Sequence, residues 1–143
     1  MAYTPLTPGA VGPLEWLNSF INNSATIWEK AGAQIDEPAH KAVMYDANGN
    51  VVIATDGESA IGTILSSSLD PILEGAPVHI LIKYIGLLSA SAAIAKGELL
   101  TIDANGQGTP AQSGDFIFGR AYTATSGAGE TVQIQINPMG FMA

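Results

Sequence analysis

The sequence predicts a mainly β domain, and three observations support that fold class. The 143 residues include 16 glycines and 8 prolines, which interrupt regular structure, and only 13% of the residues are charged. Short apolar runs alternate with clusters of Gly, Asn and Ser, a spacing that is typical of strands joined by turns. The second half of the chain also repeats the pattern of the first half. We therefore expect strands to dominate from Lys41 onward, in a small β-barrel or sandwich.

Residues 1–13 predict an extended N-terminal arm. The segment contains no charged residue, and its three prolines exclude a helix or a central strand. Disordered tails are normally rich in charged and polar residues, whereas this segment carries Tyr3, Leu6 and Val11. An uncharged, extended segment with apolar side chains is suited to binding a partner.

Residues 14–31 predict a short helical or irregular segment. Apolar residues recur there at spacings of three and four, which fits one face of a helix; they are Leu14, Leu17, Phe20 or Ile21, Ala25, Trp28 and Ala31. The polar run from residue 22 to residue 24 interrupts this pattern, so that two short pieces fit as well as one helix. Both tryptophans, Trp16 and Trp28, lie in the segment, and covering one end of the core would explain them.

A hairpin is predicted around Asn48-Gly49, because both positions of such a turn need positive φ angles that Asn and Gly tolerate. Its strands are residues 41–46 and 51–55. Five further strands are expected at residues 60–66, 77–85, 99–103, 116–123 and 130–137. The segments 66–75 and 89–97 have the composition of single helical turns.

An internal repeat relates the two halves. The tetrapeptide Asp-Ala-Asn-Gly occupies residues 46–49 and again residues 103–106, an offset of 57. At this offset, seven of the 17 positions from 46 to 62 are identical, including Ala54, Gly57 and Gly62. After an adjustment of three residues, the sequence PVHILI (77–82) falls on TVQIQI (131–136). Two copies predict pseudo-twofold character, since a solenoid needs at least three repeats.

The charge and composition exclude several classes of protein. Five basic residues stand against 13 acidic ones, a net charge of −8 that disfavours binding to nucleic acids and to anionic membranes. The chain has no cysteine, which removes disulfides and thiolate chemistry. The N-terminus has no basic region followed by an apolar one, so we expect no signal peptide. The most apolar stretch, residues 78–88, is too short to span a bilayer.

Metal sites have little support. The two Asp-Ala-Asn-Gly motifs resemble the start of a calcium-binding loop, but the twelfth position, which should be acidic, is Gly57 in one copy and Gly114 in the other. A hairpin turn explains both motifs. His40 and His79, the only histidines, do not have the spacing of zinc ligands. We expect no metal and no other cofactor.

The sequence also lacks the motifs of common enzymes. It has no GxSxG nucleophile elbow, no SxxK motif and no glycine-rich nucleotide-binding loop. Arg120, the only arginine, could pair with a carboxylate across an interface or lie on a strand surface. We therefore expect that the protein is not an enzyme.

The chain from about residue 31 to residue 136 resembles the capsid decoration, or cement, proteins of tailed phages, which are similar in role to the head decoration protein of phage lambda. The stretches that carry the resemblance are AGAQIDEPAHKAVMYDANGNVVIA, AIGTIL, EGAPVHILIKYIG, IAKGELLTIDANGQGTPAQSGDFIFGRAY and GAGETVQIQI. They cover roughly three-quarters of the chain and consist of β-turn and strand phrases. The segment 14–31 departs from the commonest members of that family.

The resemblance implies a β-barrel or β-tulip-like domain, here residues 32–137, with an extended capsid-binding arm at residues 1–13 and an apolar tail at residues 138–143. It also implies a homotrimer that is made in the host cytoplasm and binds the outer surface of the expanded head in the virion. The partner would be the major capsid protein, whose neighbouring subunits the protein would clamp and stabilise.

Two sets of residues are candidates for these contacts. The arm residues expected to bind the capsid, by adding a strand to a sheet edge and filling apolar pockets, are Tyr3, Thr4, Pro5, Leu6, Thr7, Pro8, Val11 and Leu14. The residues expected to support self-association are apolar and lie in the C-terminal tail; they are Met139, Phe141 and Met142.

Two other functions remain open. A carbohydrate- or host-surface-binding β module would show exposed aromatic side chains on one strand face. A small β-barrel enzyme would place two of four side chains in one concave pocket; the four are Asp56, Glu58, Asp115 and His79.

Overall fold

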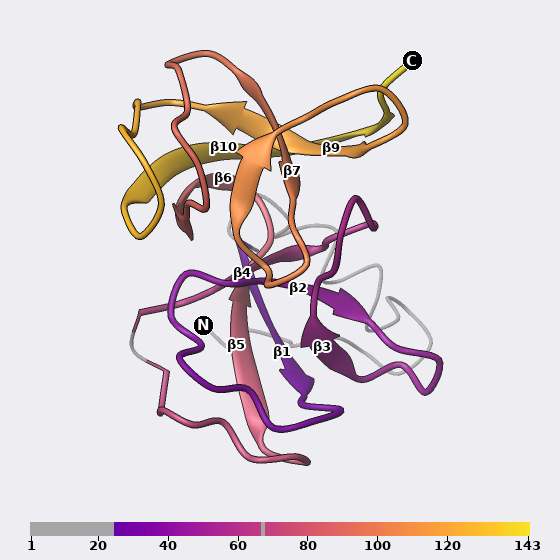
Figure 1. The fold of residues 1–143 in the computed structure, drawn as a ribbon. Helices are drawn as coiled ribbons and strands as arrows, with labels where there is room; N and C mark the ends of the chain where they lie inside the picture. The colour runs from indigo at the N-terminus through magenta and orange to yellow at the C-terminus, as the bar shows by residue number, and fades with distance from the viewer. Residues whose placement is uncertain (1–24, 67) are drawn as a thin grey trace, which may run out of the picture.

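The computed structural model describes residues 25–66 and 68–143, which form ten β-strands in two five-stranded sheets and contain no helix (Figure 1). The strands of the first sheet are β1 (Thr26–Lys30), β2 (Ala42–Tyr45), β3 (Val51–Ile53), β4 (Gly62–Ile64) and β5 (Pro77–Leu81). The strands of the second sheet are β6 (Tyr84–Ser89), β7 (Leu99–Ile102), β8 (Gly108–Pro110), β9 (Phe116–Ala121) and β10 (Thr131–Phe141).

The two sheets have the same topology. The first has the strand order β1-β5-β4-β2-β3 and the second has the order β6-β10-β9-β7-β8, with all neighbours antiparallel. Each strand of the second sheet therefore takes the place of the strand five earlier in the chain. Figure 1 shows the sheets as two stacked lobes, the first built from residues 25–82 and the second from residues 84–143.

The offset of 57 residues seen in the sequence recurs in the local hydrogen bonds. The carboxylate oxygen Oδ1 of Asp46 accepts hydrogen bonds from the backbone N–H groups two and four residues later, at 2.8 and 3.0 Å. The Oδ1 atom of Asp103 does the same at 2.8 and 2.9 Å. In both copies the aspartate thus fixes the hairpin turn, because its side chain satisfies donors that the tight turn leaves unpaired.

Two equivalent glycines allow close contact between strands. A Cβ atom on Gly62 would lie 2.2 Å from the carbonyl oxygen of Leu81, and a Cβ atom on Gly119 would lie 2.2 Å from that of Gln135. No side chain fits at such a distance, so glycine is required at both positions for β4 to approach β5 and for β9 to approach β10.

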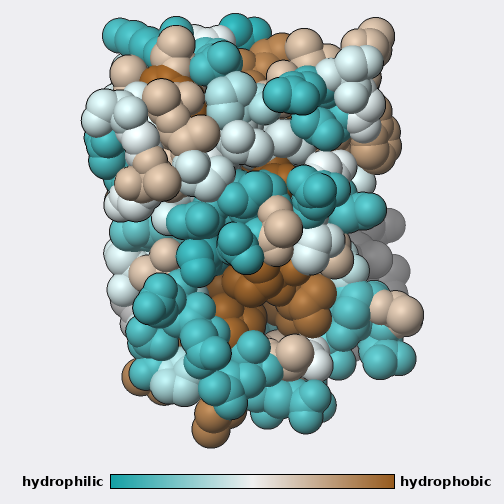
Figure 2. Space-filling model, viewed as in Figure 1, coloured by the Kyte–Doolittle hydropathy of each residue, from teal (hydrophilic) through white to brown (hydrophobic). Residues whose placement is uncertain are grey.

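Each lobe has its own hydrophobic core. The core of the first lobe consists of Ala31, Ile35, Val43, Val51, Ile64, Ile72, Val78 and Ile80. The core of the second lobe is centred on Phe118, with Leu88, Leu100, Ile102, Val132 and Ile134 fully buried around it. Figure 2 shows hydrophobic side chains gathered at the surface of the first lobe and ringed by hydrophilic ones.

The expected single β-barrel is not what the described residues form. Each sheet curls until its two edge strands approach, but they meet only at one isolated bridge, between Ala31 and Val51 in the first lobe and between Ala90 and Gly108 in the second. The result is two curled, open sheets rather than one closed barrel, because three-residue edge strands offer too few backbone groups to complete the ladder.

The lobes are joined head to tail. The backbone N–H of Ala42 donates to the carbonyl of Gly106, and the N–H of Gly57 donates to the carbonyl of Ile102, both at 2.8 Å. Two other alanines of the first lobe, Ala54 and Ala60, are buried in the core of the second lobe. We call the first-lobe surface made by Ala42, Ala54, Gly57 and Ala60 the docking face, and residues 102–106 the second turn end.

This contact is not reciprocal. A Cβ atom on Gly106 would lie 2.8 Å from a methyl group of Ile53, whereas a Cβ atom on its counterpart Gly49, or on Gly114, would meet none of the described residues within 4 Å. A twofold axis would place both turns in the same surroundings. The two turns therefore have different surroundings in the described part of the chain, and the expected pseudo-twofold character does not hold for these contacts.

Several predicted elements differ from the observed ones. Within the segment 14–31, where a helix was one expectation, residues 26–30 form the strand β1, which pairs with β5 in the register Trp28↔His79; residues 14–24 lie outside the described part of the chain. Among their described residues, the segments 66–75 and 90–97 form turns, bends and isolated bridges without a helical turn, and Ser89 is the last residue of β6. The expected strand 77–85 is two strands, β5 and β6.

The C-terminal tail is not a separate segment. Strand β10 continues to Phe141, and after a bulge beyond Ile136 it pairs again with β9, in the register Gly140↔Ile117 and Phe141↔Phe116. No helix among the described residues is long and apolar enough to cross a membrane.

Candidate interaction site

The predicted capsid-binding residues of the arm lie outside the described residues; they are Tyr3, Thr4, Pro5, Leu6, Thr7, Pro8, Val11 and Leu14. Their role stays a prediction.

The predicted self-association residues lie at the end of β10. Met139 and Phe141 are 43% and 64% exposed, and Met142 is half-buried. One edge of the Phe141 ring packs against Phe116, with 5.5 Å between ring centroids and an interplanar angle of 70°. This segment thus uses one side to bind its own lobe and leaves the other side available to a partner.

The four side chains considered for catalysis do not share a pocket. Asp115 lies beside the turn that carries Asp56 and Glu58, since its Oδ1 atom would be 3.0 Å from a Cβ on the intervening Gly57. None of these three carboxylates lines any of the three principal hollows of the described surface. His79 lines one of them, which is mainly apolar. Among the described residues, no group of histidine and acidic side chains could hold a metal ion.

That hollow, which we call the Trp28 hollow, has a volume of about 360 Å³. Its lining residues come from β1, β5 and the loop between β4 and β5; they are Trp28, Ser68, Leu69, Pro71, Ile72, Leu73, Ala76, Pro77 and His79. The pairing of β1 with β5 sets Trp28 opposite His79, and their rings stack with centroids 4.1 Å apart and planes 3° from parallel.

The loop is held over the hollow by backbone hydrogen bonds. Ile72 is buried, and it exchanges two backbone hydrogen bonds with Ile35, at 2.8 and 2.9 Å. Anchoring the centre of the loop leaves Leu69 and Leu73 at the surface, 82% and 59% exposed, beside Trp28, which is 63% exposed. Exposed apolar side chains that gather in this way mark protein–protein contacts more often than isolated ones do.

The chemistry of the Trp28 hollow suits an apolar partner. Apart from the Ser68 side chain and the His79 ring, its lining is apolar. A sugar site would need several polar groups that converge on hydroxyls. The sequence does not indicate this site directly, since segment 66–75 has the composition of a helical turn and covering one end of the core would explain Trp28. The pair of exposed leucines on either side of Asp70-Pro71 was the signal that could have indicated it.

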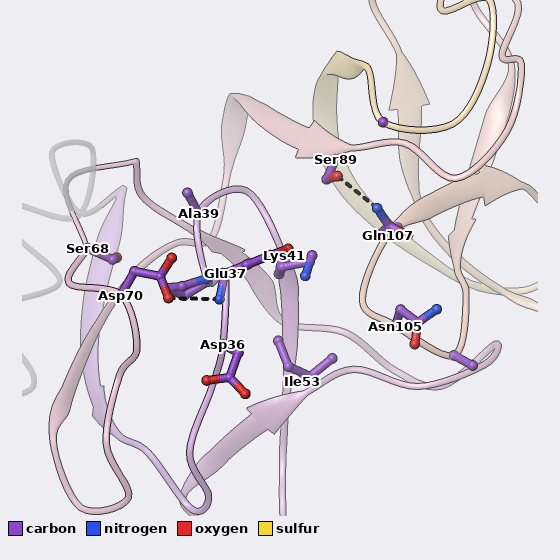
Figure 3. Close-up of a pocket in the computed structure, with 13 residues that line it drawn as sticks. Asp36, Glu37, Ala39, Lys41, Ile53, Ser68, Asp70, Ser89, Asn105 and Gln107 are labelled. Atoms are coloured by element: carbon purple, nitrogen blue, oxygen red, sulfur yellow. Dashed lines mark hydrogen bonds between the residues drawn. The ribbon is translucent and has the colours of Figure 1, made fainter.

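A wider groove, of about 770 Å³, lies where the two lobes meet (Figure 3). The first lobe contributes Asp36, Glu37, Lys41 and Asp70, and the second contributes the amides of Asn105 and Gln107. The Asp70 carboxylate accepts a hydrogen bond from the backbone N–H of Glu37 at 3.0 Å. The Gln107 side-chain amide donates to the Ser89 hydroxyl at 3.0 Å. These bonds fix the walls of a polar, largely acidic groove.

Neighbouring groups shift the pKa values of Tyr45 and Glu130. The Tyr45 hydroxyl donates a hydrogen bond to the Glu29 carboxylate, and this bond, with some burial and the nearby negative charge, raises the pKa of Tyr45. The bond connects β2 to β1, which are not neighbours in the sheet, and so reflects the curl of the first lobe. Hydrogen bonds from Ser126 lower the pKa of the exposed Glu130.

No protein-family model matches the chain, and no curated protein matches its sequence. Among solved structures, the crystal structure of the N base of head fiber gp8.5 of bacteriophage phi29 matches with a TM-score of 0.61 and 15% sequence identity. The match covers 82% of this chain and 98% of that chain. At this identity the likeness is one of fold, and the chain is thus similar in fold to the base of a phage head fiber.

Proposed function

We propose that the protein is a phage head-associated protein that binds the outer surface of the expanded capsid and stabilises it by clamping neighbouring major capsid subunits. The observation that carries the proposal is the fold shared with the N base of a phage head fiber over nearly the whole of that chain. The sequence resemblance to capsid decoration proteins supports the same role.

The charge and surface of the protein are consistent with this role. A net charge of −8 repels packaged DNA and therefore suits the outside of a head better than its lumen. The apolar surface at the Trp28 hollow, with three large side chains more than half exposed, is of the kind that a protein partner covers. We propose no enzymatic activity.

The N-terminal arm is the proposed principal capsid-binding element. Its prolines favour extended conformations and reduce the entropy lost on binding. Its apolar residues can fill pockets next to an exposed strand of the capsid sheet. We further propose a homotrimer that self-associates through Met139, Phe141 and Met142. Three weak arms on one trimer then bind together, and their effective concentration raises the overall affinity on the order of a hundredfold or more.

The test is co-sedimentation with expanded heads that lack the protein. A chain from which residues 2–13 are deleted should no longer bind heads, while its thermal unfolding stays close to that of the full chain. The matched control keeps the arm length but replaces Tyr3, Leu6 and Val11 by Ser, and it should also lose binding. If either variant saturates heads at the concentration required by the full chain, the arm is not the capsid-binding element.

A separate variant tests the rest of the surface. Trp28→Ala removes the most exposed aromatic side chain of the Trp28 hollow without touching the core of either lobe. Reduced head binding by this variant, with an unchanged thermal unfolding curve, would indicate that the hollow contributes to the capsid contact. No binding of the full chain to expanded heads at any concentration would contradict the proposed function itself.

A further inference from the structure

The backbone N–H groups of two equivalent glycines, Gly57 and Gly114, donate hydrogen bonds to different parts of the chain. In the first lobe, the N–H of Gly57 donates to the carbonyl of Ile102, on the second turn end, at 2.8 Å. In the second lobe, the N–H of Gly114, which is 57 residues later, donates to the carbonyl of Met142 at 2.8 Å. The carbonyl of Met142 therefore occupies the position, relative to the second lobe, that a turn end occupies relative to the first lobe.

The C-terminal segment makes further contacts beside Gly114. The N–H of Met142 donates to the carbonyl of Asp115 at 2.7 Å, and Phe141 and Gly140 pair with the first two residues of β9. The counterparts of the docking face in the second lobe are Leu99, Ala111, Gly114 and Ile117. They are less buried than the docking face itself, because Leu99 and Ala111 are half-buried, whereas Ala42 and Ala54 are fully buried.

A second turn end is present whose glycine has no close neighbour among the described residues, since a Cβ atom on Gly49 would meet nothing within 4 Å. Residues 45–49, which we call the first turn end, are the counterpart of residues 102–106 at the same offset. Both turns have the same aspartate hydrogen bonds and the same positive φ at their glycine, 80° at Gly49 and 75° at Gly106. Gly106 is buried against the first lobe, but Gly49 is exposed and Tyr45 is 46% exposed.

We propose that residues 138–142 mask a second docking face, and that the occupant of this face, when it is unmasked, is the first turn end of a second copy of the chain. The carbonyl of Tyr45 in that copy then takes the hydrogen bond from Gly114 that Met142 takes in the free protein. The occupant is identified by the molecule's own internal contact, in which the same turn docks on the same strands between the two lobes.

The consequence of unmasking is open-ended association. The contact joins unlike surfaces, so each added copy presents a new docking face and a new turn end. Such heterologous contacts form open chains unless the rotation happens to close a ring. The C-terminal segment therefore acts in the same way as a terminal capping repeat, which covers the last stacking surface of a repeat protein.

The experiment compares the full chain with a chain that ends at Asn137, by sedimentation velocity and light scattering over a range of concentrations and without capsids. Because this truncation also removes the residues proposed for the trimer contact, the truncated chain should be a monomer at low concentration. Its mass should then rise with concentration past that of a trimer without reaching a plateau, whereas the full chain should keep one mass. Adding Gly49→Asn should abolish this rise. Asn tolerates the positive φ of this turn, but in the proposed contact Gly49 takes the closely packed position that Gly106 has between the lobes, and there the Asn side chain would clash. The matched control is Gly49→Asn in the full chain, which should change neither the mass nor the unfolding curve.

A second variant removes the mask without shortening the chain. Met142→Pro deletes the N–H that donates to Asp115, and it should cause the same association, again reversed by Gly49→Asn. Folding of both variants is checked by circular dichroism. The proposal is overturned if the mass of a folded variant does not rise with concentration, or if its association is insensitive to Gly49→Asn. It is equally overturned if both variants are unfolded, since the segment would then be an indispensable part of the lobe rather than a mask.

Discussion

Replacing each turn glycine by alanine tests whether the two equivalent turns have the different surroundings described above. Gly49 and Gly106 have nearly the same backbone conformation, with φ angles of 80° and 75°. Alanine at a positive φ costs about 1–2 kcal/mol of stability, and this cost applies to both positions. The loss of flexibility in the unfolded chain is also the same for both, so that it cancels in the comparison.

Only Gly106 has a second cost. A Cβ atom there would lie 2.8 Å from the Cγ2 atom of Ile53 and 3.0 Å from the carbonyl oxygen of Ala42. The backbone cannot move away freely, because the carbonyl of Gly106 accepts the hydrogen bond from the N–H of Ala42. Overpacking of this kind typically costs about 1–3 kcal/mol. We therefore expect Gly106→Ala to destabilise the protein by about 2 kcal/mol more than Gly49→Ala does.

The assay is thermal and urea unfolding of both variants, followed by circular dichroism. For a protein of this size, 2 kcal/mol corresponds to a difference in Tm of roughly 6 °C between the variants. Gly49→Asn and Gly106→Asn provide a second pair, in which the φ cost is small and the difference should persist. Equal Tm values for the two alanine variants would refute the head-to-tail contact between the lobes.

Three further predictions concern single side chains. Asp103→Ala should cost about 1–2 kcal/mol in urea unfolding because it leaves two turn N–H groups without their acceptor, whereas Asp103→Asn, which keeps an acceptor oxygen, should cost less. The pKa of Tyr45 is raised, so the hydrogen bond from Tyr45 to Glu29 stabilises the fold fully at pH values below the ordinary tyrosine pKa near 10. This stabilisation is lost as the pH rises through the raised pKa. A tyrosinate absorbance titration should show that Glu29→Gln lowers the pKa of Tyr45. Gly119→Ala should prevent native pairing of β9 with β10, because its Cβ would lie 2.2 Å from the carbonyl oxygen of Gln135, and amide exchange of β10 should become fast.

The features that could be predicted from the sequence are those with local signals. The hairpin turns were predicted correctly because Asn-Gly occurs at both, and the strands β2, β3, β4, β7 and β9 begin or end within a few residues of the expected positions. The class of the fold, mainly β, followed from the same signals. The offset of 57 residues is visible in the sequence because certain glycines are required in both copies. The turn glycines have positive φ angles, and Gly62 and Gly119 allow neighbouring strands to approach closely.

The features that could not be predicted depend on contacts distant in the sequence. Strand β1 has apolar residues at helical spacing, but pairing with β5 overrides that weak preference. The break between β5 and β6 occurs at Tyr84, which adopts a φ of 70° although tyrosine does not favour it, so that no turn residue marks the position. Strand β8 ends in Pro110, and a proline argues against a strand inside a sheet. The structure places β8 at the edge of the second sheet, where proline is tolerated.

The candidate interaction sites also combine features that have local sequence signals with features that depend on distant contacts. An apolar C-terminus could be read from the sequence, but its pairing with β9 could not, because β9 ends ten residues before β10 begins and the paired ends lie farther apart still. The Trp28 hollow likewise needs the register of β1 on β5 and the anchored loop beside it, and neither has a local signal.

The separation of the two sheets along the chain also affects how the protein folds during synthesis. All five strands of the first sheet lie between residues 26 and 81, and all five of the second lie between residues 84 and 141. Because domains generally fold from the N-terminus as the ribosome releases them, the first lobe can complete its strand pairing while the second is still being translated. The docking face of the first lobe is then folded before the second turn end leaves the ribosome. The second turn end can therefore bind a surface that is already formed.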